Sequence, residues 1–545
     1  MKRHSRARGI GALVLASMLS TAMIGGNAQA GSPSLPVDLF PPRIALEHSE
    51  LGPPPLTIDF TATATDDDGK IRSLEICVSD MVDGRECSSR QGTPPNVVSD
   101  LAACTEGDTL TEVVTHTFDA PGWYQIEVSA VGATCPGFAE TQGTEFELIV
   151  LAPPLPPIVC AQEGVPTATD VGVEPDSVRL GAVVSETGVD GDTDFLARQA
   201  IWAAKDAVNE SGGVCGRDLA IDILDDGSHH QPGRERVQEL IDSGVFALVS
   251  MPGWRALQSV IEDGTLTAAG VPVIGSAGRV DAEFGHELVW PAAPPAEVFA
   301  IDAVAHAYDA GARTFAIVVN DDAVGLETAD LLRDEVLSRP GTEVRFSHVA
   351  RWSRDDATAA VVAMREECGP AGCDAVLLDL GLVNSVFWGL DTEEQQAQPN
   401  VETSASARAA VGSLAHVCGP ACDDWLVWSG FDLPVPGAGE QAFRYAAEVA
   451  RHPPLGEVSS VQASTVAAYA GVITAARAMG AVGVELTRAD LGDVLDSVPI
   501  DIGLTDGPLA WSAVARDANR SMRAYVLDAG ELLGLRPVDG WTPAP

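Results

Sequence analysis

Lysine is scarce in this chain, and basic residues as a whole are outnumbered by acidic residues. Only three residues are lysine (Lys2, Lys70 and Lys205), and 33 Lys and Arg residues face 78 Asp and Glu residues, a formal net charge of −45. A surface this acidic repels phosphate backbones and anionic lipid headgroups. The charge therefore disfavours nucleic-acid partners and indicates a strongly hydrated, soluble protein.

Aromatic residues are few as well, at 5%, yet the hydrophobic fraction of 46% is ordinary for globular proteins. We therefore expect cores built mainly from aliphatic side chains, and the composition excludes a disordered or collagen-like chain. The 545 residues are too many for one ordinary domain. At about 150 residues per domain, they correspond to roughly three or four compact units.

Long apolar runs are also missing beyond the first thirty residues, where none approaches the length of a membrane span. The first thirty combine a basic start, an apolar stretch over 9–26 and the small-residue site Ala28-Gln29-Ala30. This order predicts a cleaved signal peptide over 1–30, and hence a secreted, periplasmic or outer cell-surface protein. No cysteine follows the cleavage site, so we expect no lipid anchor there.

Signatures of catalysis are missing too. The chain has no Gly-x-Ser-x-Gly elbow, no His-Glu-x-x-His pair and no phosphate loop. We therefore predict that the protein is not an enzyme and needs no cofactor.

The cysteines, by contrast, are informative. The chain has ten cysteines, and in an oxidising compartment this even number predicts five disulfides. Cys368 with Cys373 and Cys418 with Cys422 form two local pairs; a four-cysteine zinc site is the alternative for them. If bonds form within modules, Cys160 is left to pair with Cys215. The remaining four are Cys77, Cys87, Cys104 and Cys135.

Proline clusters divide the chain. We interpret the Pro-rich segments 31–55 and 153–177 as extended, semi-rigid spacers. Between them, over 56–152, polar and apolar residues alternate in short runs separated by turn signals such as Asp66-Asp67-Asp68-Gly69. This pattern predicts a β-sandwich.

The sandwich segment resembles a polycystic-kidney-disease (PKD) repeat, an immunoglobulin-like domain. The matching stretches are Asp67-Asp68-Gly69-Lys70-Ile71 and the string from Thr115 to Tyr124. The family's Trp-bearing strand is replaced by Glu75-Ile76-Cys77-Val78. The resemblance implies a spacer or adhesion module rather than chemistry.

Residues 178–545 show a different pattern. Continuous apolar runs, each followed by an amphipathic stretch, begin at Val178 and recur as far as Trp428. Buried strands alternating with helices predict parallel sheets covered on both faces. About 365 residues exceed one such sheet, so two α/β lobes are expected. A closed eight-stranded α/β barrel also fits the alternation alone.

The sequence of this region is similar to the sequences of the type I periplasmic solute-binding proteins, the family of branched-chain amino acid and amide receptors. The matching blocks follow one another over 180–188, 207–217, 224–228, 269–276, 504–511 and 522–528. The resemblance implies an α/β fold of two doubly wound parallel sheets joined by a hinge. It places lobe 1 at about 178–297 and 434–505, and lobe 2 at about 298–433 and 506–545.

The same resemblance implies that the ligand meets loops at strand ends. The ligand-binding residues carried over are Ser185, Thr187, Gly253, Trp254, Ser276, Ala277, Gly278, Arg279 and Asp432. The Ser-rich helix start of the amino-acid receptors is replaced by Pro252-Gly253-Trp254, and their Thr by Arg279. Because those hydroxyls bind an α-carboxylate, we expect Arg279 to clamp a carboxylate instead and Trp254 to stack on the ligand. The structural alternatives are that Arg279 pairs with neighbouring acids and that Trp254 packs under its helix.

Two acidic stretches have the spacing of calcium loops only in part. Asp190 to Asp194 lacks the required glycine, and its acids favour the start of the helix that follows. Asp66-Asp67-Asp68-Gly69 is interpreted as an ordinary turn, with a calcium loop as the alternative. We therefore predict no metal site.

Together these features predict an exported receptor that captures a small polar or amphiphilic molecule, such as an amino-acid-like compound, an amide or an organic acid. Delivery to the membrane permease of an ABC importer would follow, with the receptor acting as a monomer. The alternatives are an extracellular sensor or adhesion subunit and a secreted hydrolase carrying an accessory sandwich.

Overall fold

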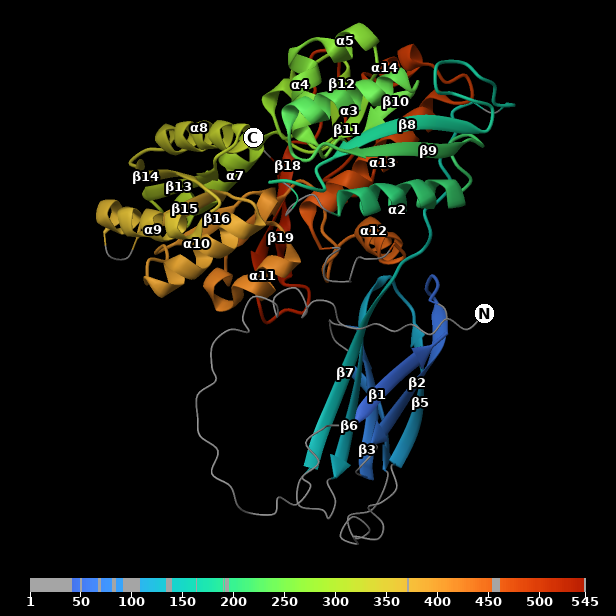
Figure 1. The fold of residues 1–545 in the computed structure, drawn as a ribbon, viewed down its shortest axis with the longest axis vertical. Coiled ribbons are helices and arrows are strands. Elements are labelled where there is room, and N and C mark those ends of the chain that lie inside the picture. Colours follow the sequence, from blue (N-terminus) through green and yellow to red (C-terminus); the bar gives the residue numbers. More distant parts are fainter. Residues whose placement is uncertain are drawn as a thin grey trace, which may run out of the picture. The chain divides into compact units, whose positions relative to one another are not determined.

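The computed structural model describes residues 42–49, 51–66, 70–80, 85–91, 108–133, 140–162, 164–189, 191, 196–369, 372–452 and 461–543. It divides into two compact units, 1–153 and 154–545 (Figure 1). The predicted signal peptide, Cys104, Cys135 and the acidic residues at 67, 68, 190, 192 and 194 lie outside the described residues.

The first unit consists of antiparallel strands in two sheets. One sheet has the order β1 (Arg43–His48), β2 (Leu56–Asp66), β5 (Asp108–Phe118). The other has the order β4 (Arg85–Gln91), β3 (Lys70–Ser79), β6 (Gly122–Ala133), β7 (Glu140–Leu151). Apolar residues alternate along the strands and meet in one buried cluster, which contains Phe60, Ile76 and Ile126. A disulfide joins Cys77 to Cys87 across β3 and β4.

The second unit begins with the Pro-rich segment that is predicted to be a spacer. Its described residues 154–162 and 164–176, here called the strap, pack against lobe 1. The buried guanidinium of Arg217 donates hydrogen bonds to the carbonyl oxygens of Thr167, Glu174 and Val484 at 2.8–2.9 Å. Cys160 and Cys215 form the predicted disulfide. The strap stays in place because lobe 1 satisfies its backbone polar groups.

Lobe 1 is built on a five-stranded parallel sheet with the order β12 (Val289–Pro291), β11 (Val273–Ser276), β10 (Ala247–Val249), β8 (Ser177–Val184), β9 (Asp218–Asp225). Its helices are α2 (Ala197–Glu210), α3 (His230–Asp242), α4 (Trp254–Glu262), α5 (Thr265–Ala269), α6 (Asp281–Phe284), α12 (Glu440–Ala450), α13 (Ala463–Val482) and α14 (Arg488–Leu495). The strands are continuous apolar runs because both faces of the sheet are covered.

Helix α13 is the central helix of lobe 1. By length and composition alone it could cross a membrane, although no segment beyond the leader was predicted to have this length of apolar residues; 78% of its apolar stretch is buried inside the protein. Gly471 of this helix lies against Gly275 of β11, where a Cβ on Gly275 would stand 2.4 Å from the Gly471 Cα. Two glycines are therefore needed for this close approach of helix and strand.

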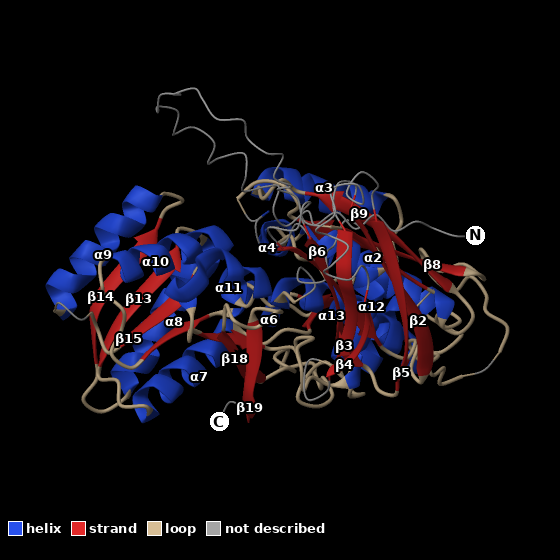
Figure 2. Ribbon diagram, turned by 90° about the horizontal axis from the view of Figure 1, so that it is seen from below, coloured by secondary structure: helices blue, strands red, loops and turns tan. Residues whose placement is uncertain are grey.

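Lobe 2 is built on a seven-stranded sheet with the order β14 (Glu343–Ala350), β13 (Thr314–Asn320), β15 (Ala375–Asp379), β16 (Glu402–Ala405), β17 (Leu426–Ser429), β18 (Ser521–Leu527), β19 (Leu535–Pro543). The first five strands are parallel and the last two antiparallel. Figure 2 shows α9 (Arg354–Cys368) and α10 (Leu382–Glu394) on one face, with α7 (Ala296–Asp309) and α8 (Ala323–Ser338) on the other. Helix α11 (Gly412–Cys418) and the 3₁₀ turns η3 (Ala407–Ala409) and η4 (Gly419–Cys422) follow β16.

Three sequence-based expectations are decided here. Two separate open sheets replace the closed barrel that the alternation also allowed. The local cysteine pairs are the disulfides Cys368–Cys373 and Cys418–Cys422. The block 504–511, which the resemblance to the receptor family matches to one of that family's closing strands, is irregular here; its residue Leu509 forms a single bridge with Ile500.

Candidate functional site

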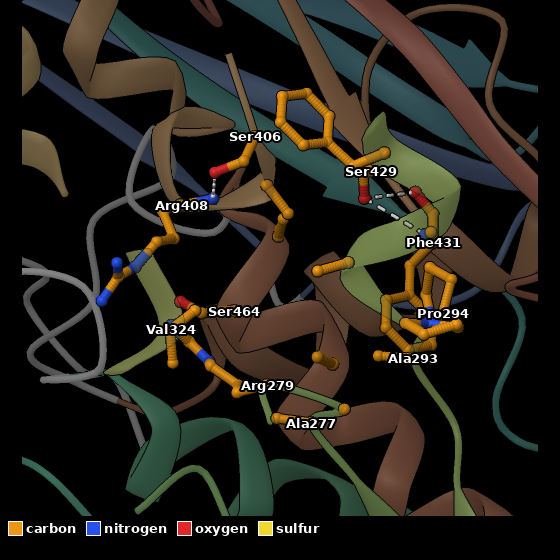
Figure 3. Close-up of a pocket in the computed structure, with 18 of the residues that line it drawn as sticks. Ala277, Arg279, Ala293, Pro294, Val324, Ser406, Arg408, Ser429, Phe431 and Ser464 are labelled. Atoms are coloured by element: carbon orange, nitrogen blue, oxygen red, sulfur yellow. Dashed lines mark hydrogen bonds between the residues drawn. The ribbon is translucent and has the colours of Figure 1, made fainter. Parts of the chain in front are cut away.

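A pocket lies between the two sheets, at the carboxyl ends of their parallel strands, where such sheets leave backbone groups and loops for a ligand. It encloses about 850 Å³ of space that protein atoms do not fill, part of it open to solvent (Figure 3). Most of its lining is small or apolar: Pro252, Ala277, Gly278, Ala293, Pro294, Pro295, Ala296, Phe299, Val324, Ala407, Gly430, Phe431, Ala463, Ala467, Ala468 and Met522. Three charged residues join it, namely Arg279, Asp379 and Arg408.

The lobe 1 wall is shaped by the loops that follow β10 and β11. Ser250, directly after β10, is 1% exposed and has a left-handed φ of 64°, and its hydroxyl has no hydrogen-bond partner among the described residues. After β11, the buried Glu283 carboxylate accepts backbone N–H bonds from Gly278 (3.0 Å), Arg279 (2.8 Å) and Val280 (3.3 Å). Burial raises the pKa of Glu283 above its ordinary value. This carboxylate fixes the turn that brings Arg279 into the lining.

The lobe 2 wall contains a buried network of charges. Arg408 donates to both Asp322 oxygens, at 2.7 and 3.3 Å, and to Asp379 Oδ2 at 3.4 Å. The other oxygen of Asp379 accepts a bond from the Ser406 hydroxyl. Asp322 also caps α8 by accepting the Gly325 N–H at 2.8 Å. Burial raises the pKa of Asp322, but attraction to Arg408 outweighs this effect and leaves the pKa below its ordinary value.

A third guanidinium, that of Arg255 in the first turn of α4, comes from lobe 1 and interacts electrostatically with this network. Arg255 is 8% exposed and stacks on the ring of Trp254 at 4.2 Å. Burial lowers the pKa of Arg255 to about 10; Asp322 raises it, and the cations Arg408 and Arg279 lower it. At neutral pH the residue is charged, so the region around Asp322 holds several cations.

The two lobes touch beside the pocket. Trp254 and Val280 of lobe 1 pack on Val324 of lobe 2. Next to this contact, the Asp281 N–H donates to Glu327 Oε1 at 3.2 Å. Burial and the facing Asp281 carboxyl raise the pKa of Glu327 to about 8. This lobe–lobe contact therefore contains two acidic side chains.

The structure brings only part of the predicted site into the lining. Ala277, Gly278 and Arg279 line the pocket, and Ser276 ends the strand before them. Trp254 does not line it: the side chain is 1% exposed and packs under Arg255. As a ligand contact, Trp254 therefore remains only a prediction.

The other predicted residues belong to networks behind the walls. The Ser185 hydroxyl donates to Asp226 at 2.9 Å and the Thr187 hydroxyl to Asp225 at 2.7 Å. Gly253 donates its N–H to the Val183 carbonyl at 2.9 Å. The Asp432 carboxylate accepts bonds from Arg523, from Tyr525 and from the Gly439 N–H. None of these four is part of the lining.

Sequence reasoning missed Arg408 and the first turn of α13. Arg408 follows β16, whose sequence Glu-Thr-Ser-Ala has no apolar run and therefore gave no strand signal. Ala463, Ser464, Ala467 and Ala468 reach the pocket because α13 starts there. Small residues at the start of an otherwise apolar helix are the only local sequence signal that could have predicted the part of the pocket lining formed by α13.

The family model described as "Periplasmic binding protein" matches residues 177–531. The chain belongs to this family.

Solved structures share its fold at low sequence identity. A fatty acid ABC transporter substrate-binding protein from Thermomonospora curvata is 20% identical, with a TM-score of 0.58 over 70% of this chain and 95% of that chain. A solute-binding protein of an ABC transporter from R. palustris, in complex with 4-hydroxybenzoate, is 15% identical, with a TM-score of 0.56 over 68% and 98%. A leucine-binding protein from Thermotoga maritima is 12% identical, with a TM-score of 0.54 over 67% and 98%. A search of curated proteins finds no significant match.

Proposed function

We propose that this protein captures a small organic acid with an apolar body outside the membrane, by closing its two lobes on the ligand. The observation that carries the proposal is the composition of the pocket. Its lining is mainly apolar, and its charged residues are two arginines and one aspartate. An apolar surface binds a ring or chain by excluding water, and a guanidinium grips a carboxylate with two parallel hydrogen bonds.

A free amino acid fits this pocket poorly. An α-ammonium group needs an acidic or carbonyl partner. The one acid in the lining, Asp379, already accepts bonds from Ser406 and Arg408. Asp432, a predicted partner, lies outside the lining and is bonded to Arg523. The pocket therefore favours a ligand that has a carboxylate and no ammonium group.

Delivery to an ABC importer is part of the proposal. The solved structures that share the fold include a fatty acid ABC transporter substrate-binding protein and a solute-binding protein of an ABC transporter in complex with 4-hydroxybenzoate, and both of these ligands are amphiphilic acids. The N-terminal unit would act as an immunoglobulin-like spacer, and the leader would direct export. An extracellular sensor is the second candidate, because the capture and delivery of a solute do not require the additional two-sheet unit.

The test is a thermal-shift and calorimetry screen of residues 31–545 against short and medium fatty acids, substituted benzoates, the matching amides and branched-chain amino acids. Acids should raise the melting temperature, because a ligand that binds only the native state adds RT ln(1 + [L]/Kd) to its stability. The matching amides should bind more weakly. Binding of leucine or valine but of no acid would contradict the proposal. Binding of acids without growth or transport defects in a deletion strain would favour the sensor.

A further inference from the structure

We propose that Arg408 sets the charge selectivity of the pocket: by holding Asp322 and Asp379, it keeps their carboxylates from accepting a cationic ligand and so excludes amines. The inference rests on the proposed function, since it concerns the same pocket and a ligand of defined charge. It assigns the exclusion of amines to a residue that touches the acids rather than to the overall shape of the pocket.

The geometry shows that one guanidinium serves two acids. Arg408 is 7% exposed, Asp322 is 9% exposed at its side chain and Asp379 is 4% exposed at its side chain, so the three form a buried cluster. The bond to Asp322 is a two-pronged one, at 2.7 and 3.3 Å, and the contact with Asp379 is longer, at 3.4 Å. Of the two carboxylates, Asp379 lies in the pocket lining and Asp322 does not. Asp379 is therefore the carboxylate that a ligand would meet.

The position of Asp379 would suit a cation if Arg408 were missing. Asp379 ends β15, and Ser406 follows β16, the neighbouring parallel strand. With Ser406 on one oxygen and no guanidinium on the other, a buried carboxylate would lack a counter-charge, which is costly in a dry site. An ammonium group in the pocket would supply that charge. Arg408 supplies it instead from within the protein.

The direction of the Arg408 side chain supports a neutralising role. In Figure 3, the backbone of Arg408 lies beside Ser406, joined by the bond from the Arg408 N–H to the Ser406 hydroxyl at 3.4 Å, and the side chain extends away from Ser429 and Phe431. The guanidinium thus points toward the acids rather than across the apolar end of the pocket. Arg279, from lobe 1, is the cation that faces the ligand in the proposed function.

The experiment uses a charge-matched double variant, Arg408→Gln with Asp322→Asn. Arg408→Gln alone leaves two buried carboxylates without their partner and is expected to fold poorly. Removing the Asp322 charge together with the guanidinium keeps the net charge of the cluster, and Asn caps a helix about as well as Asp. In the double variant, only Asp379 keeps a carboxylate, and it now lacks its cation. Asp322→Asn alone is the matched control, because it retains Arg408 on Asp379.

The probes are two series that differ in charge and share a skeleton: benzoate, benzamide and benzylamine, and hexanoate, hexanamide and hexylamine. Calorimetry on residues 31–545 at neutral pH gives the affinity ratio of acid to amine for each protein. The wild type and the Asp322→Asn control should prefer the acid. In the double variant the ratio should shift toward the amine by at least about thirty-fold, the effect of one charge-assisted contact in a closed site. Melting curves of the empty proteins establish that each variant is folded.

The outcomes separate this inference from the proposed function. A folded double variant that binds no amine more tightly than the wild type does overturns the role of Arg408. If the wild type binds acids in that case, the proposed function stands alone. If the wild type binds none of the acids but the double variant binds amines, the proposed function fails and the role of Arg408 stands. An equal gain of amine binding in Asp322→Asn would also overturn it, because Arg408 is still present there.

Discussion

The two lobes are stabilised and lined in different ways. In lobe 1, a disulfide between residues 55 positions apart and the buried Arg217 attach the strap, so distant parts of the chain are joined. In lobe 2, the two disulfides span only five and four positions and staple local turns. Because the entropy lost on closing a loop grows with its length, the covalent restraint on lobe 1 should stabilise the protein more.

The two walls of the pocket also differ in the groups that form them. Lobe 1 forms its wall mainly from backbone, where Gly275 allows β11 to approach α13 and a buried carboxylate fixes the following turn. Lobe 2 forms its wall from a buried ion-pair network around Arg408. One wall therefore depends on shape and the other on charge. Substitutions in the backbone turns of lobe 1 should therefore act on stability first. Substitutions of the charged lining residues, Arg279 in lobe 1 and Arg408 in lobe 2, should act on ligand binding.

The largest expected effect tests the long covalent link. Replacing Cys160 and Cys215 by Ser should lower the free energy of unfolding by about 4 kcal/mol on the chain-entropy model, because a loop of 55 positions is opened. The same change at Cys368 and Cys373 should cost about 2 kcal/mol. Urea unfolding of the full chain measures both. Equal losses of unfolding free energy in the two variants would contradict the expectation that the long disulfide of lobe 1 stabilises the protein more than a short disulfide of lobe 2.

The backbone wall of lobe 1 is tested by Gly275→Ala. The residue has φ of +67°, and its new Cβ would meet Gly471 at 2.4 Å. The left-handed backbone and the overpacking together should cost about 3 kcal/mol of unfolding free energy. Gly264→Ala is the control, with φ of +76° and open space around it, and should cost about 1 kcal/mol. A loss at Gly275 no larger than that at Gly264 would show that helix and strand can move apart.

The carboxylate clamp proposed for lobe 1 is tested by Arg279→Ala. If Arg279 clamps a carboxylate, affinity for the best acid should fall at least about thirty-fold. The melting temperature of the empty protein should hardly change. Arg333→Ala, on the exposed surface of α8, is the control and should leave affinity unchanged. Calorimetry on the wild type and the two variants measures these affinities. An affinity of Arg279→Ala within about threefold of the wild-type value would contradict the proposed carboxylate contact.

The smallest expected effect concerns the lobe–lobe contact. Because its pKa is raised to about 8, Glu327 stays protonated in the folded protein where the unfolded chain has already released the proton. The stability it contributes is complete below about pH 4 and is lost as the pH rises toward 8. Glu327→Gln should therefore match the wild type at pH 4 and be more stable by about 1 kcal/mol at pH 9, since partial exposure reduces the full effect. Urea unfolding at both pH values measures it; a constant difference would contradict it.

Most of the α/β architecture could be predicted from local patterns. The first of the predicted apolar runs, at Val178, is β8 (Ser177–Val184), and the last, which ends at Trp428, is β17 (Leu426–Ser429). Both were found because a strand buried on two faces is a continuous apolar run. The pattern failed at β16, where polar residues occupy a central strand, and with it Arg408 was missed. For the Pro-rich segment 153–177, the sequence predicted the Cys160–Cys215 bond but not the hydrogen bonds from Arg217, because proline content reports backbone stiffness and not what a segment contacts.

The amino-acid sequence by itself determined the class of this protein: two parallel-sheet lobes, the covalent pairs Cys160–Cys215, Cys368–Cys373 and Cys418–Cys422, and the loop that brings Arg279 to the pocket. Only the tertiary structure decided which charged residues line the pocket and which of them are paired with one another. Arg408 meets Asp322 and Asp379, which are 86 and 29 positions away, and the packing of Trp254 removes it from the lining. Whether a charge is neutralised depends on separations of a few ångström in space, and those are set by how the strands and helices of a lobe pack together.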